Sequence, residues 1–136
     1  MRAAELYDYA VVRVVPRVER EEFINAGVIL SCQKSGFLRA AIELDVARLR
    51  ALDAHVDVPT VQRHLGAIVA ICAGAPEGGP IARLPLRARF HWLTARRSGI
   101  IQTSPVHTGL CVDPDAALAH AMARMVRPLP APRGPA

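Results

Sequence analysis

The sequence has few aromatic residues, few cysteines and no long apolar stretch. Its 136 residues include three Phe, two Tyr and one Trp, so aliphatic side chains must build the core. The three cysteines are odd in number and far apart, which favours free thiols in a reducing compartment. No apolar run reaches the roughly 20 residues that a membrane helix needs, and the N-terminus lacks the apolar region of a signal peptide. We therefore expect a cytoplasmic protein without membrane contacts.

Lysine is almost absent, because Lys34 is the only lysine among 17 basic residues. Arginine therefore carries nearly all of the formal net charge of +5. Two interpretations stay open. The arginines serve to bind phosphate or carboxylate, which the planar guanidinium holds through two parallel hydrogen bonds, or they follow the compositional bias of an Ala-, Arg- and Pro-rich sequence. The net charge alone indicates non-specific attraction to polyanions, and it does not identify a specific partner.

The sequence also lacks the motifs of common metal and cofactor sites. Neither Cys-x-x-Cys nor His-x-x-x-His spacing occurs, so we expect no metal site. The glycine patterns that bind nucleotide phosphates are missing too. The sequence therefore predicts no cofactor.

The first third of the chain has the pattern of β-strands. Tyr7–Val15 and Phe23–Cys32 are rich in β-branched and apolar residues, and Phe37–Leu44 follows a short polar turn. These runs predict an antiparallel meander whose first two strands are paired neighbours. Gly27 lies inside the second strand and predicts a bulge or the close approach of another backbone.

Helical periodicity replaces the strand pattern further along. Asp45 can cap a short helix, and longer amphipathic helices are predicted at Val58–Ala73 and Asp113–Val126. Pro85–Thr94 predicts another short helix, and Ile100–Thr103 predicts a fourth strand.

Together these elements predict a single α+β domain over residues 5–127. We expect a small antiparallel sheet of three to four strands, with the two main helices packed on one face. The Pro-rich residues 128–136 are expected to form a disordered tail.

Hydrogen-bonding groups are most concentrated between Arg96 and Leu110. Ser104 and His107 lie three residues apart there, with Pro105 between them. A catalytic pair would also need an orienting acid and an oxyanion hole. Two further interpretations stay open: an anion site, or polar side chains that satisfy backbone groups in a buried turn.

The anion-site hypothesis makes a specific spatial prediction. Six side chains should line one polar concavity: Arg89, Arg97, Ser104, His107, Thr108 and Asn25. Asn25 belongs to the set because an amide in a mostly apolar strand needs a polar partner. Binding of single-stranded nucleic acid is less well supported, because Phe90 and Trp92, the aromatic residues nearby, fit a core pattern.

Several segments, in order along the chain, carry a resemblance to a known family. A Tyr-rich first strand followed by Glu22–Leu30, Arg89–Leu93 and Ser98–Leu110 resembles the bacterial family catalogued as domain of unknown function 3037. The resemblance spans about Tyr7 to Val126. Genes of that family often lie in operons beside genes for proteins that resemble HipA-type serine/threonine kinases, so the resemblance implies a HipA-like kinase as a protein partner.

The leading hypothesis is thus a non-catalytic binding or accessory module that works with such a kinase and binds a phosphate or carboxylate ligand. The alternative is an enzyme acting on a phosphate-containing substrate, with His107 as general acid or base. Co-purification with a kinase would favour the first, and phosphodiester hydrolysis without a partner would favour the second.

Overall fold

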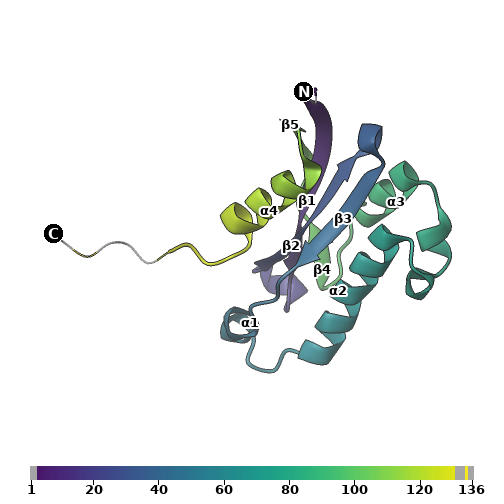
Figure 1. Cartoon of the computed structure of the whole chain (residues 1–136). Helices are drawn as coiled ribbons and strands as arrows, with labels where there is room; N and C mark the ends of the chain where they lie inside the picture. The colour runs from purple at the N-terminus through teal and green to yellow at the C-terminus, as the bar shows by residue number, and fades with distance from the viewer. Residues whose placement is uncertain (1–2, 131–133, 135–136) are drawn as a thin grey trace.

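A five-stranded antiparallel sheet is the centre of the fold over the described residues (Figure 1). The computed structural model describes residues 3–130 and residue 134. The strands are β1 (Glu5–Val14), β2 (Ile24–Cys32), β3 (Phe37–Ile42), β4 (Ile101–Thr103) and β5 (His107–Cys111). Their order is β3-β2-β1-β4, and β5 pairs with the N-terminal half of β1. Strand β1 is therefore central, which explains its apolar sequence.

The predicted meander is confirmed. Strands β1 and β2 are antiparallel neighbours, and β3 pairs with the other side of β2. The prediction of three to four strands misses β5. The reason is local: β5 contains a glycine and exposed polar side chains and follows Pro105, so its sequence reads as a turn.

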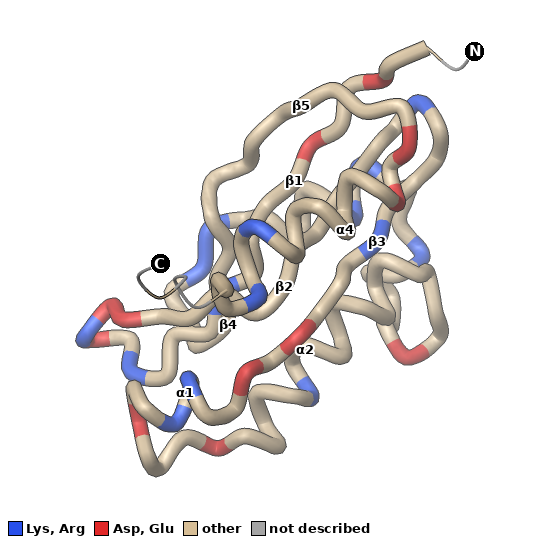
Figure 2. The backbone as a smooth tube through the Cα atoms, turned by 60° about the vertical axis from the view of Figure 1, so that its left-hand side comes forward, with Lys and Arg blue, Asp and Glu red and all other residues tan. Residues whose placement is uncertain are grey.

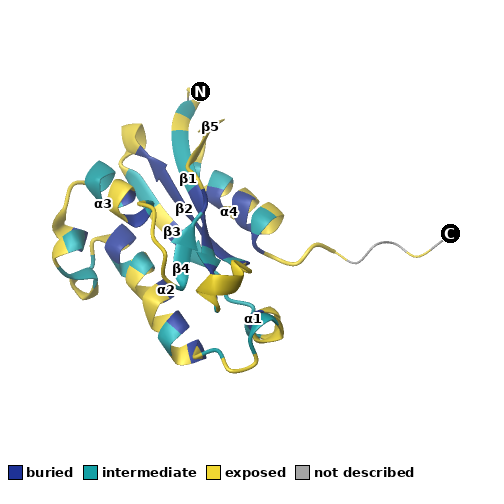
Figure 3. Ribbon diagram, turned by 180° about the vertical axis from the view of Figure 1, so that it is seen from behind, coloured by how far each residue is buried: buried dark blue, intermediate teal, exposed yellow. Residues whose placement is uncertain are grey.

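The helices cover both faces of the sheet (Figure 3). Helices α2 (Val58–Ala73) and α3 (Leu86–Leu93) pack on one face, and α4 (Pro114–Met125) packs on the other. The prediction that both main helices share one face is therefore wrong. Strand β2 is buried on both sides, so each side of the sheet needs a cover.

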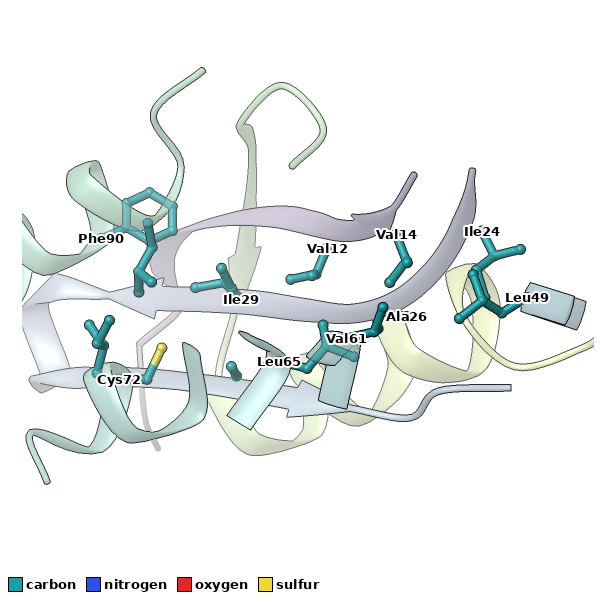
Figure 4. Close-up of a cluster of buried hydrophobic side chains, with 13 residues drawn as sticks. Val12, Val14, Ile24, Ala26, Ile29, Leu49, Val61, Leu65, Cys72 and Phe90 are labelled. Carbon is teal, nitrogen blue, oxygen red and sulfur yellow. The ribbon is translucent and has the colours of Figure 1, made fainter. Parts of the chain in front are cut away.

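The larger core lies between the sheet and α2 and α3 (Figure 4). Val12 and Ile29 project from the sheet, Leu65 comes from α2, and Phe90 comes from α3; each is at most 2% exposed. A smaller core on the opposite face joins Val28 of β2 to α4. The two cores fix the positions of the C-terminal ends of α2 and α4, whose carbonyls accept hydrogen bonds from Arg89 and Asn25.

Aspartates cap the N-termini of three of the α-helices. The Asp45 carboxylate accepts a hydrogen bond from the Arg48 backbone N–H at the start of α1 (Val46–Leu52), and Asp113 accepts one from Asp115 at the start of α4. These caps confirm the predicted helix starts, because a side-chain oxygen satisfies a backbone donor that the helix leaves free. Asp57 caps α2 in the same way through the Thr60 N–H.

The prediction for Gly27 is also confirmed. The register of β1 and β2 shifts beside it, between Val12 and Arg13. A Cβ atom at Gly27 would lie 2.5 Å from the carbonyl oxygen of Ala41 in β3. Glycine is therefore required by a close backbone approach next to a bulge.

Within the described ranges, no single helix is long and apolar enough to cross a membrane; only the bent pair of α2 and η3 (Pro76–Arg83) passes together by length and composition, and α2 packs against the sheet. Residues 128–130 form neither helix nor strand. The rest of the predicted disordered tail, apart from residue 134, lies outside the described residues.

Candidate functional site

Three arginines converge on a cleft at the edge of the sheet beside β4. We call it the arginine cleft; its volume is about 650 Å³, and its lining includes Arg13, Glu21, Phe23, Arg96, Arg97 and Gln102. A second hollow of about 490 Å³ shares all three arginines and Gln102, and continues toward Thr103 and Ser104. The two hollows therefore form one basic region. Basic residues as a whole are spread over the molecule (Figure 2), so this convergence is local.

Arg13 is held in place by the sheet. It lies next to the β-bulge in β1 and pairs with Gln102 of β4. Its guanidinium lies 4.3 Å from the centre of the Phe23 ring. Its Nε atom is buried and has no hydrogen-bond partner among the described residues. Because Nε is buried, only the rest of the Arg13 side chain, which lines the cleft, is open to a ligand.

Arg97 is held by the end of α3. Its guanidinium donates to the carbonyl oxygens of Leu93 at 3.2 Å and Trp92 at 2.6 Å, and it lies 4.3 Å from the Trp92 ring centre. The last carbonyls of a helix lack intrahelical donors and attract cations. Arg97 thus ties the exposed segment between α3 and β4, yellow in Figure 3, to the helix end beside the cleft.

The cleft also includes one acidic wall residue. Glu21 has a φ of 56° and is, within the described part of the chain, the only residue other than glycine with a positive φ. Its backbone N–H donates to the Val18 carbonyl at 3.2 Å. Such left-handed backbone is uncommon outside glycine, and it tends to occur at functional sites.

Ser104 serves the backbone. It is 5% exposed, its Oγ accepts a hydrogen bond from the Val11 N–H at 2.8 Å, and it donates to the Pro105 carbonyl at 2.9 Å. This arrangement corresponds to the interpretation of a polar side chain that satisfies a buried turn. Ser104 reaches only the far end of the second hollow.

His107 and Thr108 lie on opposite faces of the sheet, because successive residues of a strand alternate. The centre of the His107 ring lies 5.3 Å from that of the Tyr9 ring, with the two rings tilted by 34°, on the face covered by α4. Thr108 Oγ1 donates to Asp8 at 2.7 Å on the other face, where Asp8 also pairs with Arg87 of α3. Ser104 and His107 therefore do not form the hydrogen-bonded pair that a serine nucleophile needs.

Arg89 and Asn25 cap helices elsewhere. Arg89 donates to the carbonyls of Ile71 and Cys72 at the end of α2, at 2.9 and 2.8 Å. Asn25 Nδ2 donates to the Met125 carbonyl at the end of α4, at 2.9 Å. The six residues predicted to line one concavity thus lie in several places: Arg97 lines the arginine cleft, Arg97 and Ser104 line the second hollow, and neither hollow includes the other four. The expectation of one shared concavity is corrected by strand alternation and by these helix ends.

Comparison with known proteins places this fold in a family. The family model described as "Protein of unknown function (DUF3037)" matches residues 9–126. The chain belongs to the DUF3037 family. The resemblance seen in the sequence is thereby confirmed, and the matched range contains the whole lining of the arginine cleft. No curated protein and no solved structure matches the chain.

The sequence analysis did not identify Arg13 and Phe23 as residues of the arginine cleft. A signal was present, since Arg13 is the one charged residue in the apolar run from Tyr9 to Val15. A lone charge in a central strand must reach an edge, a partner or a ligand. The segment of Arg96 and Arg97 was correctly singled out as polar, but the partner from β1 could not be located from spacing along the chain.

Two of the three cysteines of the DUF3037 domain, Cys72 and Cys111, differ in their access to solvent. Cys72 is 5% exposed, and burial raises the pKa of its thiol to about 12, against a smaller lowering by Arg89. Cys111 is partly exposed, and burial raises the pKa of its thiol too.

Among the residues with described positions, no three His, Cys, Asp or Glu side chains are grouped to hold a metal ion.

We expect iodoacetamide to alkylate Cys111 well before Cys72 at about pH 8. The thiolate is the reactive form, and a raised pKa leaves almost none of it on Cys72 at that pH. Peptide mass mapping over time measures both sites, with a urea-unfolded sample as the control in which the two react alike. Equal rates in the folded protein would contradict the buried position of Cys72.

Proposed function

We propose that this DUF3037 domain is a non-catalytic binding module that holds a phosphate or carboxylate group in the arginine cleft. The observation that carries the proposal is the convergence of Arg13, Arg96 and Arg97 on one hollow. Guanidinium groups bind phosphate and carboxylate through charge-assisted, two-pronged hydrogen bonds. The packing of the Arg13 guanidinium on the Phe23 ring supports the same assignment, since it holds the charge at the cleft.

We propose further that the anion belongs to a protein partner in the cytoplasm, with a HipA-like kinase as the partner that the family resemblance suggests. The three free cysteines support a reducing compartment. Kinases present phosphorylated side chains, and clusters of arginine are a recurring means of binding them.

We expect Arg13→Gln to weaken binding of inorganic phosphate about tenfold, because it removes a charged donor pair from the cleft. Arg124→Gln removes the same charge from an exposed position on α4 and should leave binding unchanged. Isothermal titration calorimetry, or chemical-shift changes on titration, measures both.

The controls separate a specific site from general charge. Arg13→Lys keeps the charge but loses the fork, so it should recover part of the affinity. Thermal unfolding of each variant shows that it is folded. Equal losses in Arg13→Gln and Arg124→Gln would mean that phosphate responds only to net charge, and the proposed site would be wrong.

A further inference from the structure

An apolar groove adjoins the arginine cleft. It lies between α2 and β4, has a volume of about 150 Å³, and is lined by Ile68, Ile71, Trp92, Leu93 and Ile101. Arg97 and Gln102 line both the groove and the cleft. The basic and apolar hollows therefore meet at these two side chains.

Strand β4 separates the two hollows. Ile101 pairs with Val14 and Gln102 with Arg13, so their side chains point to opposite faces of the sheet. Ile101 belongs to the face covered by α2, and Arg13 belongs to the other. A ligand that passes around the outer edge of β4 at Arg97 can reach both hollows.

Trp92 gives the groove an exposed aromatic wall. Its side chain is 41% exposed although it lines a hollow next to the core. The Arg97 guanidinium stacks on its ring at 4.3 Å and so fixes the indole and the charge relative to each other. Tryptophan and arginine are both enriched among the residues that carry most of the binding energy at the centres of protein interfaces.

We propose that the site binds an extended segment of a protein partner that places an apolar side chain beside an acidic or phosphorylated one. The proposal rests on the proposed function and names its substrate class. Charge complementarity assigns the anionic side chain to Arg13, Arg96 and Arg97. The size of the groove assigns the other position, because 150 Å³ holds one apolar side chain and little more. Neighbouring residues of an extended peptide point to opposite sides, as the two hollows require.

The single tryptophan makes the test direct, because the emission of Trp92 reports on the groove. A short glycine-rich peptide with leucine next to phosphoserine is titrated, and the same peptide with serine in place of leucine is the comparison. A third peptide, with glutamate in place of phosphoserine, compares a carboxylate with a phosphate in the arginine cleft. We expect the leucine to tighten binding about tenfold and to shift the Trp92 emission. Equal affinity with and without leucine would overturn the proposal.

Paired variants on α2 locate the effect. Ala67 is exposed and lines the groove, so Ala67→Phe should fill it and remove the advantage of leucine. Val69 lies on the same helix and is exposed away from the groove, so Val69→Phe should change nothing. Phosphate binding should be intact in both variants. Loss of the leucine advantage in both would overturn the assignment to the groove.

The outcomes also separate this proposal from the one that it rests on. Phosphate binding that depends on Arg13, together with indifference to leucine, would leave the arginine cleft standing and reject the peptide segment. Failure of both phosphate and peptides to bind would reject both proposals. Adenosine monophosphate serves as a further probe: tighter binding than the leucine peptide, lost in Ala67→Phe, would identify a nucleotide and overturn the peptide assignment.

Discussion

Replacing Gly27 by alanine lowers the free energy of unfolding by about 2–3 kcal/mol, because overpacking a close contact forces the backbone to move. The added Cβ would lie 2.5 Å from the Ala41 carbonyl oxygen and 2.5 Å from Cδ1 of Ile42. The isoleucine methyl can turn away, but the Ala41 carbonyl is part of β3 and moves only with its strand. Urea unfolding followed by circular dichroism measures the loss.

Gly66→Ala is the matched control. Gly66 lies inside α2, and a Cβ there would have nothing within 4 Å. Alanine should stabilise the protein by about 0.5–1 kcal/mol, because it restricts the unfolded chain and favours the helix. The two substitutions add the same methyl group and should have opposite signs. A neutral Gly27→Ala would contradict the close approach of β2 and β3.

Ser104→Ala should lower the free energy of unfolding by about 2 kcal/mol, because it leaves a buried backbone donor without an acceptor. The donor is the Val11 N–H, which lies 2.8 Å from Ser104 Oγ. Thermal or urea unfolding measures the effect.

Thr108→Ala is the comparison for Ser104. The Thr108 hydroxyl donates a hydrogen bond to Asp8, but Asp8 also pairs with Arg87, and the contact between Thr108 and Asp8 is exposed. Its removal should cost less than about 0.5 kcal/mol. A stable Ser104→Ala variant that loses an activity would instead return Ser104 to a catalytic role.

Local patterns were sufficient for much of the fold. Strands β1 and β2 were predictable because they are rich in β-branched and apolar residues, and Asp113 followed by Pro114 starts a helix for reasons confined to one turn. The bulge and the close backbone approach at Gly27 were likewise predictable from a glycine inside an apolar strand. Strand β5 could not, because its pairing depends on β1, which is distant in the sequence and supplies all its hydrogen-bond partners.

The candidate site was harder to predict than the fold. A search for polar density along the chain groups residues by sequence, whereas strand alternation sends His107 and Thr108 to opposite faces. Arg89 and Asn25 donate hydrogen bonds to carbonyls at the ends of α2 and α4, and the sequence alone does not show that these helix ends lie beside them. Arg97 was identified within the polar segment, and Arg13 was missed because only the folded sheet brings it to β4.

The central position of β1 has a consequence for the order in which the protein can fold during synthesis. Strand β1 leaves the ribosome first, and β2 and β3 can pair with it at once. Its other side waits for β4 and β5, and the Val11–Ser104 hydrogen bond joins residues separated by 93 positions. Such distant pairing is slow, so the nascent meander carries an open edge until β4 and β5 are made, and the apolar face that α4 covers stays bare until α4 follows. The first strand to be made is thus the last to be completed.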